Sequence, residues 1–312
     1  QTFTKERKMI TRRHLLAGSA ATLAAPVVLG TTFAQGAAAR VTILVDAFGE
    51  ASTLKRGWGY SALIEYGGRR ILFDTGSRGA DFAHNVSTLG VDLKKLDFVV
   101  VSHRHNDHTG GLSHVLRENP DVTVYTPFEI SGFNSPLGPA FNKMLTRDVP
   151  SVPVELRYFW GSPAVDNRSE APWENARFVQ ITQQTEVLPG FFLISNRSSS
   201  PGTIEMNEIS LAFRTPKGAI LVVGCSHPGI ENIVEATTKI DPRIYTVLGG
   251  FHLLGTSDDK VTATIVAFRD KWHIERMAAG HCTGQFAFAE LVRIYGPNFD
   301  IAGIGSVISL PV

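Results

Sequence analysis

The sequence predicts an α/β fold in which buried strands alternate with helices and carry polar loops at their ends. Apolar, β-branched runs predict strands at 98–101 and 219–223. Each run leads into a loop of glycine, histidine and other polar residues, and then into a segment of helical character, at 112–117 and 230–240. The 312 residues, 43% hydrophobic and 19% charged, have the composition of a globular protein with a large core.

The first 36 residues are expected to be an export signal. Arg12-Arg13 precedes an apolar Ala/Leu/Val-rich stretch at 15–29, and small residues follow it. This order is typical of a secretory signal, and the paired arginines resemble a twin-arginine signal, which exports folded proteins. We therefore expect a signal peptide at 1–36, a mature domain at 37–312, contact with the twin-arginine export machinery and a periplasmic or secreted location. An uncleaved membrane anchor is the alternative, but the apolar run is short, so we expect no stable membrane insertion after cleavage.

The mature domain is expected to begin with three strands, at 41–45, 61–66 and 69–73. Gly67-Gly68 predicts a two-residue hairpin turn between the last two. A helix is expected at 81–89. His84 in that helix, and His114 further along, have no ligand partner at local spacing, so we expect both to be solvated.

Four potential metal ligands follow the strand at 98–101 within six residues, namely His103, His105, Asp107 and His108. His103 and His105 are two apart, so in extended backbone their side chains leave on the same side and can close on one ion. Asp107 and His108 come after the chain turns and would face a second position. One loop would thus serve two metals, as in two-metal hydrolases. Imidazole and carboxylate favour one or two ions of Zn²⁺, with iron or manganese as alternatives.

Three later strand ends also carry a histidine, and loops at one edge of a sandwich can bring them to one site. His227 and His281 are expected to be metal ligands. His252 is expected either to bind metal or to hydrogen-bond a substrate oxyanion. Two cysteines, Cys225 and Cys282, lie beside these loops.

Residues 126–207 break the alternation of strands and helices, and are rich in proline, glycine, asparagine and aromatic residues. A long irregular insertion in a compact domain is usually a lid, a binding loop or a disordered segment. The aromatic residues favour order, because they give the segment something to bury. We expect an irregular insert on the substrate side that returns to the fold through a strand at 191–194.

The motif His103-x-His105-x-Asp107-His108 after a buried strand resembles the signature of the metallo-β-lactamase superfamily. The resemblance implies a four-layer αββα sandwich, which usually fills roughly 200 to 250 residues. It also implies that Asp74 lies beneath the metal site, where it would orient a metal-bound imidazole or cap the following turn, rather than ligate a metal directly. The sequences Gly-Cys-Ser-His-Pro-Gly, Gly-Gly-Phe-His and Gly-His-Cys-Thr-Gly resemble the branch named after a dihydropterin–ribofuranosyl-aminobenzene phosphate synthase.

The sequence departs from the wider superfamily at one position. A Gly-Asp dipeptide there usually supplies an aspartate that bridges the two metals, whereas this chain has Gly224-Cys225. A Cys225 thiolate could bridge, or His227 could ligate in its place. A disulfide between Cys225 and Cys282 is an alternative in an oxidising compartment. We expect the two thiols to be free or metal-associated, since both lie in metal loops of a protein exported already folded.

The function expected from these residues is metal-dependent hydrolysis of a small-molecule ester, lactone, amide or phosphoester by a metal-activated water. Asp107 would orient the water or shuttle its proton, and His252 would stabilise the oxyanion. An exported metal- or ligand-binding protein with little or no turnover is the alternative. The net charge of +1, with no Lys/Arg stripe beyond the N-terminus, predicts no nucleic-acid partner.

Overall fold

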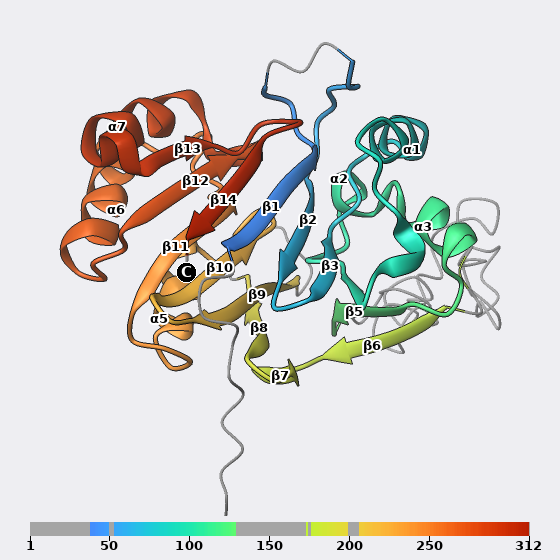
Figure 1. Cartoon of the computed structure of the whole chain (residues 1–312). Coiled ribbons are helices and arrows are strands. Elements are labelled where there is room, and N and C mark those ends of the chain that lie inside the picture. Colours follow the sequence, from blue (N-terminus) through green and yellow to red (C-terminus); the bar gives the residue numbers. More distant parts are fainter. Residues whose placement is uncertain (1–37, 50–52, 129–172, 174–175, 199–205, 312) are drawn as a thin grey trace, which may run out of the picture. The chain divides into compact units, whose positions relative to one another are not determined.

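Two seven-stranded sheets pack against each other in the computed structural model of the chain (Figure 1). The structure describes residues 38–49, 53–128, 173, 176–198 and 206–311, all within one compact unit. The predicted signal at 1–36 lies outside the described residues. No helix in the described part of the chain is both long enough and apolar enough to span a bilayer.

The first sheet has the strand order β14-β1-β2-β3-β4-β5-β6. Its strands are β1 (Ala38–Val45), β2 (Ser61–Tyr66), β3 (Arg69–Phe73), β4 (Phe98–Val100), β5 (Thr123–Pro127), β6 (Arg177–Ile181) and β14 (Val307–Pro311). Strands β3 to β6 run parallel, whereas β14, β1, β2 and β3 pair antiparallel. The predicted hairpin turn is confirmed, because Gly67 and Gly68 join β2 to β3 with φ angles of 57° and 77°.

The second sheet has the order β13-β12-β11-β10-β9-β8-β7. Its strands are β7 (Thr185–Leu188), β8 (Phe191–Arg197), β9 (Asn207–Thr215), β10 (Gly218–Val223), β11 (Ile244–Gly250), β12 (Arg276–Gly280) and β13 (Phe299–Ile301). Strands β10 to β13 are parallel, so their C-terminal ends meet at one edge of the sheet. That edge carries the loops of interest.

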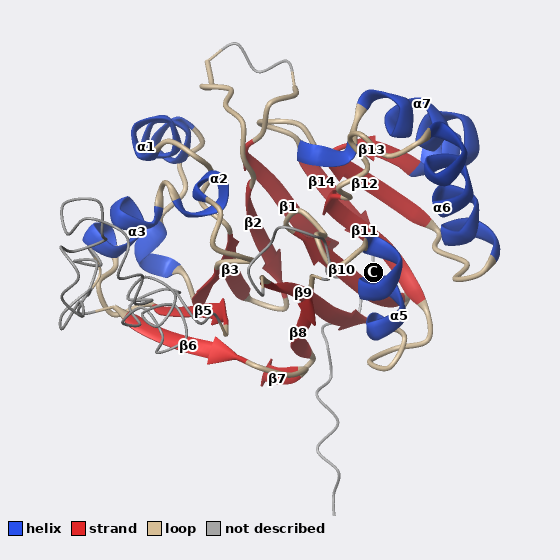
Figure 2. Ribbon diagram, turned by 180° about the vertical axis from the view of Figure 1, so that it is seen from behind, coloured by secondary structure: helices blue, strands red, loops and turns tan. Residues whose placement is uncertain are grey.

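Helices cover the outer face of each sheet (Figure 2). Helices α1 (Gly79–Thr88), α2 (Asn106–Thr109) and α3 (Leu112–Glu118) lie on the side of the first sheet, and α5 (Ile230–Thr237), α6 (Asp258–Asp270) and α7 (Gln285–Tyr295) on that of the second. Short 3₁₀ helices occupy Leu93–Lys95 (η1), His281–Thr283 (η4) and Gly296–Asn298 (η5). The predicted four-layer αββα sandwich is confirmed.

Strand β10 shows how its sequence produces these layers. Ile220 and Val222 belong to the apolar core between the sheets, while Leu221 and Val223 belong to the core beneath the helices. Successive side chains of a strand point to opposite faces, so a continuous apolar run is what a strand buried on both faces requires. Burying each such side chain contributes roughly 1.5–3 kcal/mol.

The predicted irregular insert at 126–207 is regular over part of its length. Residues 177–181 extend the first sheet as β6, and residues 185–188 and 191–197 form β7 and β8 of the second. The sequence did not predict β6, because this edge strand is exposed over most of its length. Its residues therefore show no clear alternation of apolar and polar side chains. The remainder of the insert, at 129–172, 174–175 and 199–205, lies outside the described residues.

Candidate metal centre

Loops from both sheets meet where the parallel strands end. His103 follows β4, Cys225 follows β10, His252 follows β11 and His281 follows β12. Gly224 allows this approach, because a Cβ atom there would lie 2.3 Å from the Ser102 Oγ of the facing loop. The resulting pocket of about 340 Å³ is lined by Trp58, His105, Asn106, Asp107, Cys225, His227, His252, His281 and Cys282.

Three imidazoles form the first set of converging ligand atoms, here called the histidine group. It consists of His103, His105 and His227, whose ligand nitrogens lie within 4.8 Å of one another. Ser102 fixes the tautomer of His103. The Ser102 hydroxyl donates to Asp74 Oδ2 at 2.7 Å and therefore accepts from His103 Nδ1 at 2.9 Å, which leaves the lone pair on His103 Nε2.

A buried carboxylate, Glu208 of β9, orients the third member of this group. Its Oε2 accepts from His227 Nδ1 at 3.0 Å, so the other ring nitrogen carries the lone pair. The same carboxylate accepts from the backbone N–H groups of Cys225, Ser226 and His227 at 2.7–3.0 Å. Burial alone would raise the pKa of Glu208, but these hydrogen bonds lower it, so the carboxylate is charged and holds the loop.

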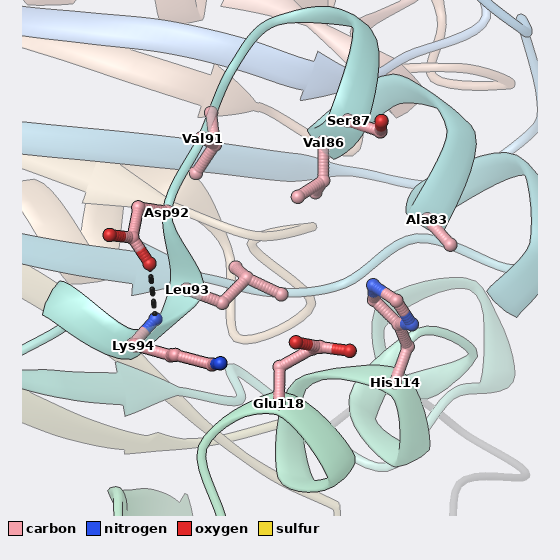
Figure 3. A pocket seen from close by; sticks show the side chains of 9 residues that line it. All are labelled: Ala83, Val86, Ser87, Val91, Asp92, Leu93, Lys94, His114 and Glu118. Atoms are coloured by element: carbon pink, nitrogen blue, oxygen red, sulfur yellow. Dashed lines mark hydrogen bonds between the residues drawn. The ribbon is translucent and has the colours of Figure 1, made fainter.

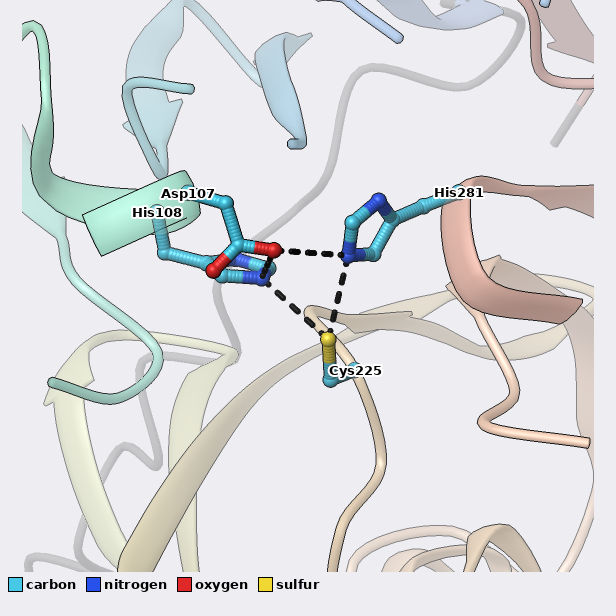
Figure 4. Close-up of side chains that lie close together, drawn as sticks. All are labelled: Asp107, His108, Cys225 and His281. Atoms are coloured by element: carbon cyan, nitrogen blue, oxygen red, sulfur yellow. Dashed lines mark hydrogen bonds and ion pairs between the residues drawn. The ribbon is translucent and has the colours of Figure 1, made fainter. Parts of the chain in front are cut away.

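The second set, here called the thiol group, contains Asp107, His108, Cys225 and His281 (Figure 4). The Cys225 Sγ lies 3.2 Å from His108 Nε2 and 3.1 Å from His281 Nε2. The Asp107 Oδ2 lies 3.6 Å and 3.5 Å from the same two nitrogens. Four donor atoms from three loops therefore face one point between the sheets.

Asp74, at the end of β3, lies beneath this second set as the family resemblance implied. Its Oδ2 lies 2.6 Å from His108 Nδ1, which directs His108 Nε2 towards Cys225. Burial alone would lower the pKa of His108, but the carboxylates of Asp74 and Asp107 raise it to about 9. Burial and the neighbouring His108 lower the pKa of His281 to about 2. Burial likewise raises the pKa of the Cys225 thiol.

His252 and Cys282 also line the pocket. Their ligand atoms and that of Cys225 lie within 4.8 Å of one another, and the His252 ring lies 4.3 Å from that of His227. His252 is exposed, whereas both cysteines are buried and free, so they form no disulfide. Burial would raise the pKa of Cys282, but hydrogen bonds with Cys225 and His252 lower it to about 6.

Backbone strain is concentrated in these loops. Asp74, Ser226, His252 and His281 all have positive φ angles, between 49° and 68°. Each such residue costs on the order of 1–3 kcal/mol and persists only where surrounding contacts hold it. His281, for example, donates its backbone N–H to the buried Asp46 Oδ2 at 2.9 Å. The site geometry is therefore held by hydrogen bonds to buried carboxylates.

Several supporting residues escaped the sequence analysis. Asp46 directly follows a buried strand, as Asp74 does, and that position was the available signal. Glu208 directly precedes the apolar part of β9, and a carboxylate at the start of a buried strand was the signal that could have identified it. Ser102 and Trp58 carried no pattern of their own.

The two histidines expected to be solvated lie apart from the site. His84 is exposed and contacts the Thr53 carbonyl oxygen at 2.8 Å. His114 lines a separate pocket of about 530 Å³ together with Glu118 (Figure 3). Neither histidine belongs to a group of three or more candidate ligands among the described residues. Among the described residues, the groups of candidate metal ligands therefore lie in the loops where the two sheets meet.

The donor set suits a divalent metal. It offers imidazole nitrogens, one carboxylate and one thiol, which are typical donors of zinc sites. In His103, His108 and His227 the opposite ring nitrogen is held by a hydroxyl or carboxylate partner, which orients the ligand. The same imidazole and carboxylate donors also accept iron or manganese.

Comparisons with known proteins agree with this geometry. Residues 55–166 match the family model described as the metallo-beta-lactamase superfamily. The chain is 30% identical over 289 residues to the 7,8-dihydropterin-6-methyl-4-(beta-D-ribofuranosyl)-aminobenzene-5'-phosphate synthase of Methanocaldococcus jannaschii, covering 86% of this chain and 95% of the relative. The resemblance to that branch is confirmed.

Solved structures share the fold. Tm1679, described as a metal-dependent hydrolase of the beta-lactamase superfamily, has a TM-score of 0.65 and 25% identity, covering 88% of this chain and all of the other. The short form of human tRNase Z has a TM-score of 0.52 and 16% identity over 88% of this chain and all of the other. The chain therefore belongs to the metallo-β-lactamase superfamily.

Proposed function

We propose that the protein is a metal-dependent hydrolase that holds one or two ions, most suitably Zn²⁺, in the histidine group and the thiol group. The observation that carries this proposal is the convergence of two ligand sets, each drawn from the loops of both sheets, on one pocket. The ligands would be His103, His105 and His227 in one set and Asp107, His108, His281 and Cys225 in the other.

A bound divalent metal would supply Lewis-acid activation of water for attack on an ester, lactone, amide or phosphoester. Asp107 reaches both Nε2 atoms of the thiol group through Oδ2, so its carboxylate is placed to orient the attacking water and take its proton. His252 is exposed and lines the pocket, where its ring would donate a hydrogen bond to the developing oxyanion. Its contact with the His227 ring keeps it beside the ligand set.

The named relative is a synthase, and a site that activates a nucleophile serves synthesis as well as hydrolysis. We propose hydrolysis for two reasons. The donors of the two groups suit the activation of water, and Tm1679, the structural neighbour with 25% identity, is described as a hydrolase. Analysis of the products by mass spectrometry separates the two reactions, since hydrolysis adds water to the substrate and synthesis joins two substrates.

The first test is metal content by elemental analysis on protein purified without chelator, followed by turnover of an ester, lactone, amide and phosphodiester panel. We expect bound metal and turnover in the parent, and loss of turnover together with the ion of the histidine group in His105→Ala. His84→Ala is the matched control, because that histidine is exposed on α1 and outside both groups. Full activity in metal-free protein would contradict the proposal. Bound metal without turnover would support the binding-protein alternative.

We also propose that the protein is exported by a twin-arginine signal at 1–36 and acts on a small molecule outside the cytoplasm. The support is the Arg12-Arg13 pair before the apolar stretch. Cell fractionation of the parent and of an Arg12→Lys, Arg13→Lys variant tests this. We expect the parent in the periplasm or medium and the variant in the cytoplasm, and equal fractionation would contradict export.

A further inference from the structure

We propose that an apolar pocket beside the metal centre binds an uncharged apolar group of the substrate, either an aliphatic chain or an aromatic ring. The inference rests on the proposed function. The pocket has a volume of about 390 Å³, within the range of small-molecule sites. It adjoins the metal pocket, because Trp58 and His281 line both.

The lining is almost entirely apolar. Phe48, Trp58 and Phe286 contribute aromatic rings, Leu254 an aliphatic side chain, and Gln285 an uncharged polar one. Trp58, Leu254 and Phe286 are 50%, 61% and 41% exposed. Three large apolar side chains that are exposed to solvent around one cavity indicate a binding surface, because side chains that serve only core packing would be buried.

The walls of the pocket are tied to the metal loops. The Trp58 ring lies 5.1 Å from the His281 ring. The Leu254 backbone N–H donates to the Cys282 carbonyl oxygen at 3.3 Å, one residue from His281. Phe48 packs edge-to-face on Phe288 of α7, with ring centroids 5.0 Å apart. A group in this pocket is therefore held at a set position relative to the ligand histidines.

The charge of the lining decides what chemistry fits. Neither pocket has a lysine or arginine among its described lining residues. A carboxylate or phosphate on the remote part of the substrate would thus lose its hydration without gaining a cation. An apolar group gains from leaving water, by about fourfold in affinity for each methylene that is fully buried.

The position of the two pockets gives the substrate its orientation. The reacting carbonyl or phosphoryl group would lie over Asp107 and His252, and the apolar group would extend past Trp58 towards Phe286. Phe286 and Leu254 would then determine specificity without touching the ligand sets.

Calorimetric titration of zinc-loaded protein with carboxylates tests the pocket without any need for turnover. Acetate, hexanoate, phenylacetate and succinate share one head group for the metal centre and differ in the remote part. We expect hexanoate or phenylacetate to bind at least about tenfold more tightly than acetate, since several carbons would be buried. Succinate, with a charge at its far end, is expected to gain nothing. The ratio between hexanoate and phenylacetate distinguishes a chain from a ring.

Variants at the pocket rim sharpen the test. Phe286→Ala and Leu254→Asp are expected to reduce the ratio of hexanoate to acetate affinity by at least about fivefold, since each removes apolar contact area. Val292→Ala is the matched control, because Val292 is also exposed on α7, at 55%, and does not line the pocket. Thermal melting confirms that each variant folds.

Two outcomes overturn the inference. One is equal affinity for acetate and hexanoate in the parent, and the other is an unchanged affinity ratio in both rim variants. Either result leaves the metal-dependent hydrolase intact. That proposal fails separately, through metal-free protein that retains full activity.

Discussion

The histidine group and the thiol group occupy one pocket but differ in donor type and charge. The histidine group has three imidazoles, which are neutral when they ligate. The thiol group adds the Asp107 carboxylate and the Cys225 sulfur, both anionic when they ligate a metal. A divalent cation therefore gains more Coulomb energy in the thiol group, and thiolate favours zinc over harder ions. We expect the two positions to be unequal, with the thiol group filled first.

The largest expected effect is the loss of a whole ion from one group. Cys225→Ala should abolish sulfur coordination and leave the histidine group able to bind one ion. Zinc X-ray absorption measures this, because a Zn–S distance of about 2.3 Å differs from Zn–N distances of about 2.0–2.1 Å. In the parent, the sulfur signal per zinc should be greatest at one equivalent and fall at two.

His105→Ala provides the opposite case. It should retain the sulfur-bound ion while losing occupancy of the histidine group, since His105 belongs to that group alone. A sulfur signal that does not change with added zinc in the parent would show that the two positions fill together, which contradicts their ranking.

The next effect concerns the carboxylate that only the thiol group contains. Asp107→Asn should reduce kcat by about 10²–10⁴, because an amide cannot accept the proton of the attacking water. Steady-state kinetics at saturating zinc gives the value. Asp270→Asn serves as the control, because Asp270 is an exposed carboxylate at the end of α6 that forms an ion pair with Arg269. A loss smaller than tenfold would remove Asp107 from the role of base.

A smaller effect is expected from the groups that orient ligands. Ser102→Ala removes the acceptor of His103 Nδ1 and should weaken zinc binding in the histidine group by about 10–100-fold. The sulfur-bound ion should be little affected, since Asp74 still contacts His108. Competition with a zinc-binding dye measures both affinities. An equal loss of affinity for the two ions would mean that Ser102 supports the whole site. Ser87→Ala on α1 is the matched control.

The smallest effect is on stability. Gly224→Ala would place a Cβ atom 2.3 Å from Ser102 Oγ and 3.0 Å from Asp74 Oδ2, where the two sheets bring their loops together. We expect a loss of about 1–3 kcal/mol in the free energy of unfolding, measured by urea denaturation of metal-free protein. Gly57→Ala is the control, since the nearest atom to its added Cβ would be Ser77 Oγ at 3.8 Å. Equal losses in both would show that the loops separate easily.

Sequence patterns predicted the central strands and the ligand loop because their signals are local. The limits of β2 and β3 follow from apolar runs on either side of Gly67-Gly68, and both were confirmed. The edge strands β6, β7, β13 and β14 were missed, because edge strands are short and partly exposed. The interior strand β5 was missed as well. The helix α6 was also missed, because its apolar face is weak beside its charged residues.

The sequence by itself determined the donor chemistry: which histidines follow strands, that a cysteine, Cys225, follows the strand at 219–223, and that the spacing of His103 and His105 lets both leave an extended chain on one side. Only the tertiary structure decided the partners. Cys225 lies 117 residues from His108 and 56 residues from His281, yet contacts both. Glu208 of β9 reaches His227 in the loop after β10, and Trp58 lines both the metal pocket and the apolar pocket. Contacts of this range depend on the order of strands within a sheet and on how the two sheets pack, and local periodicity encodes neither.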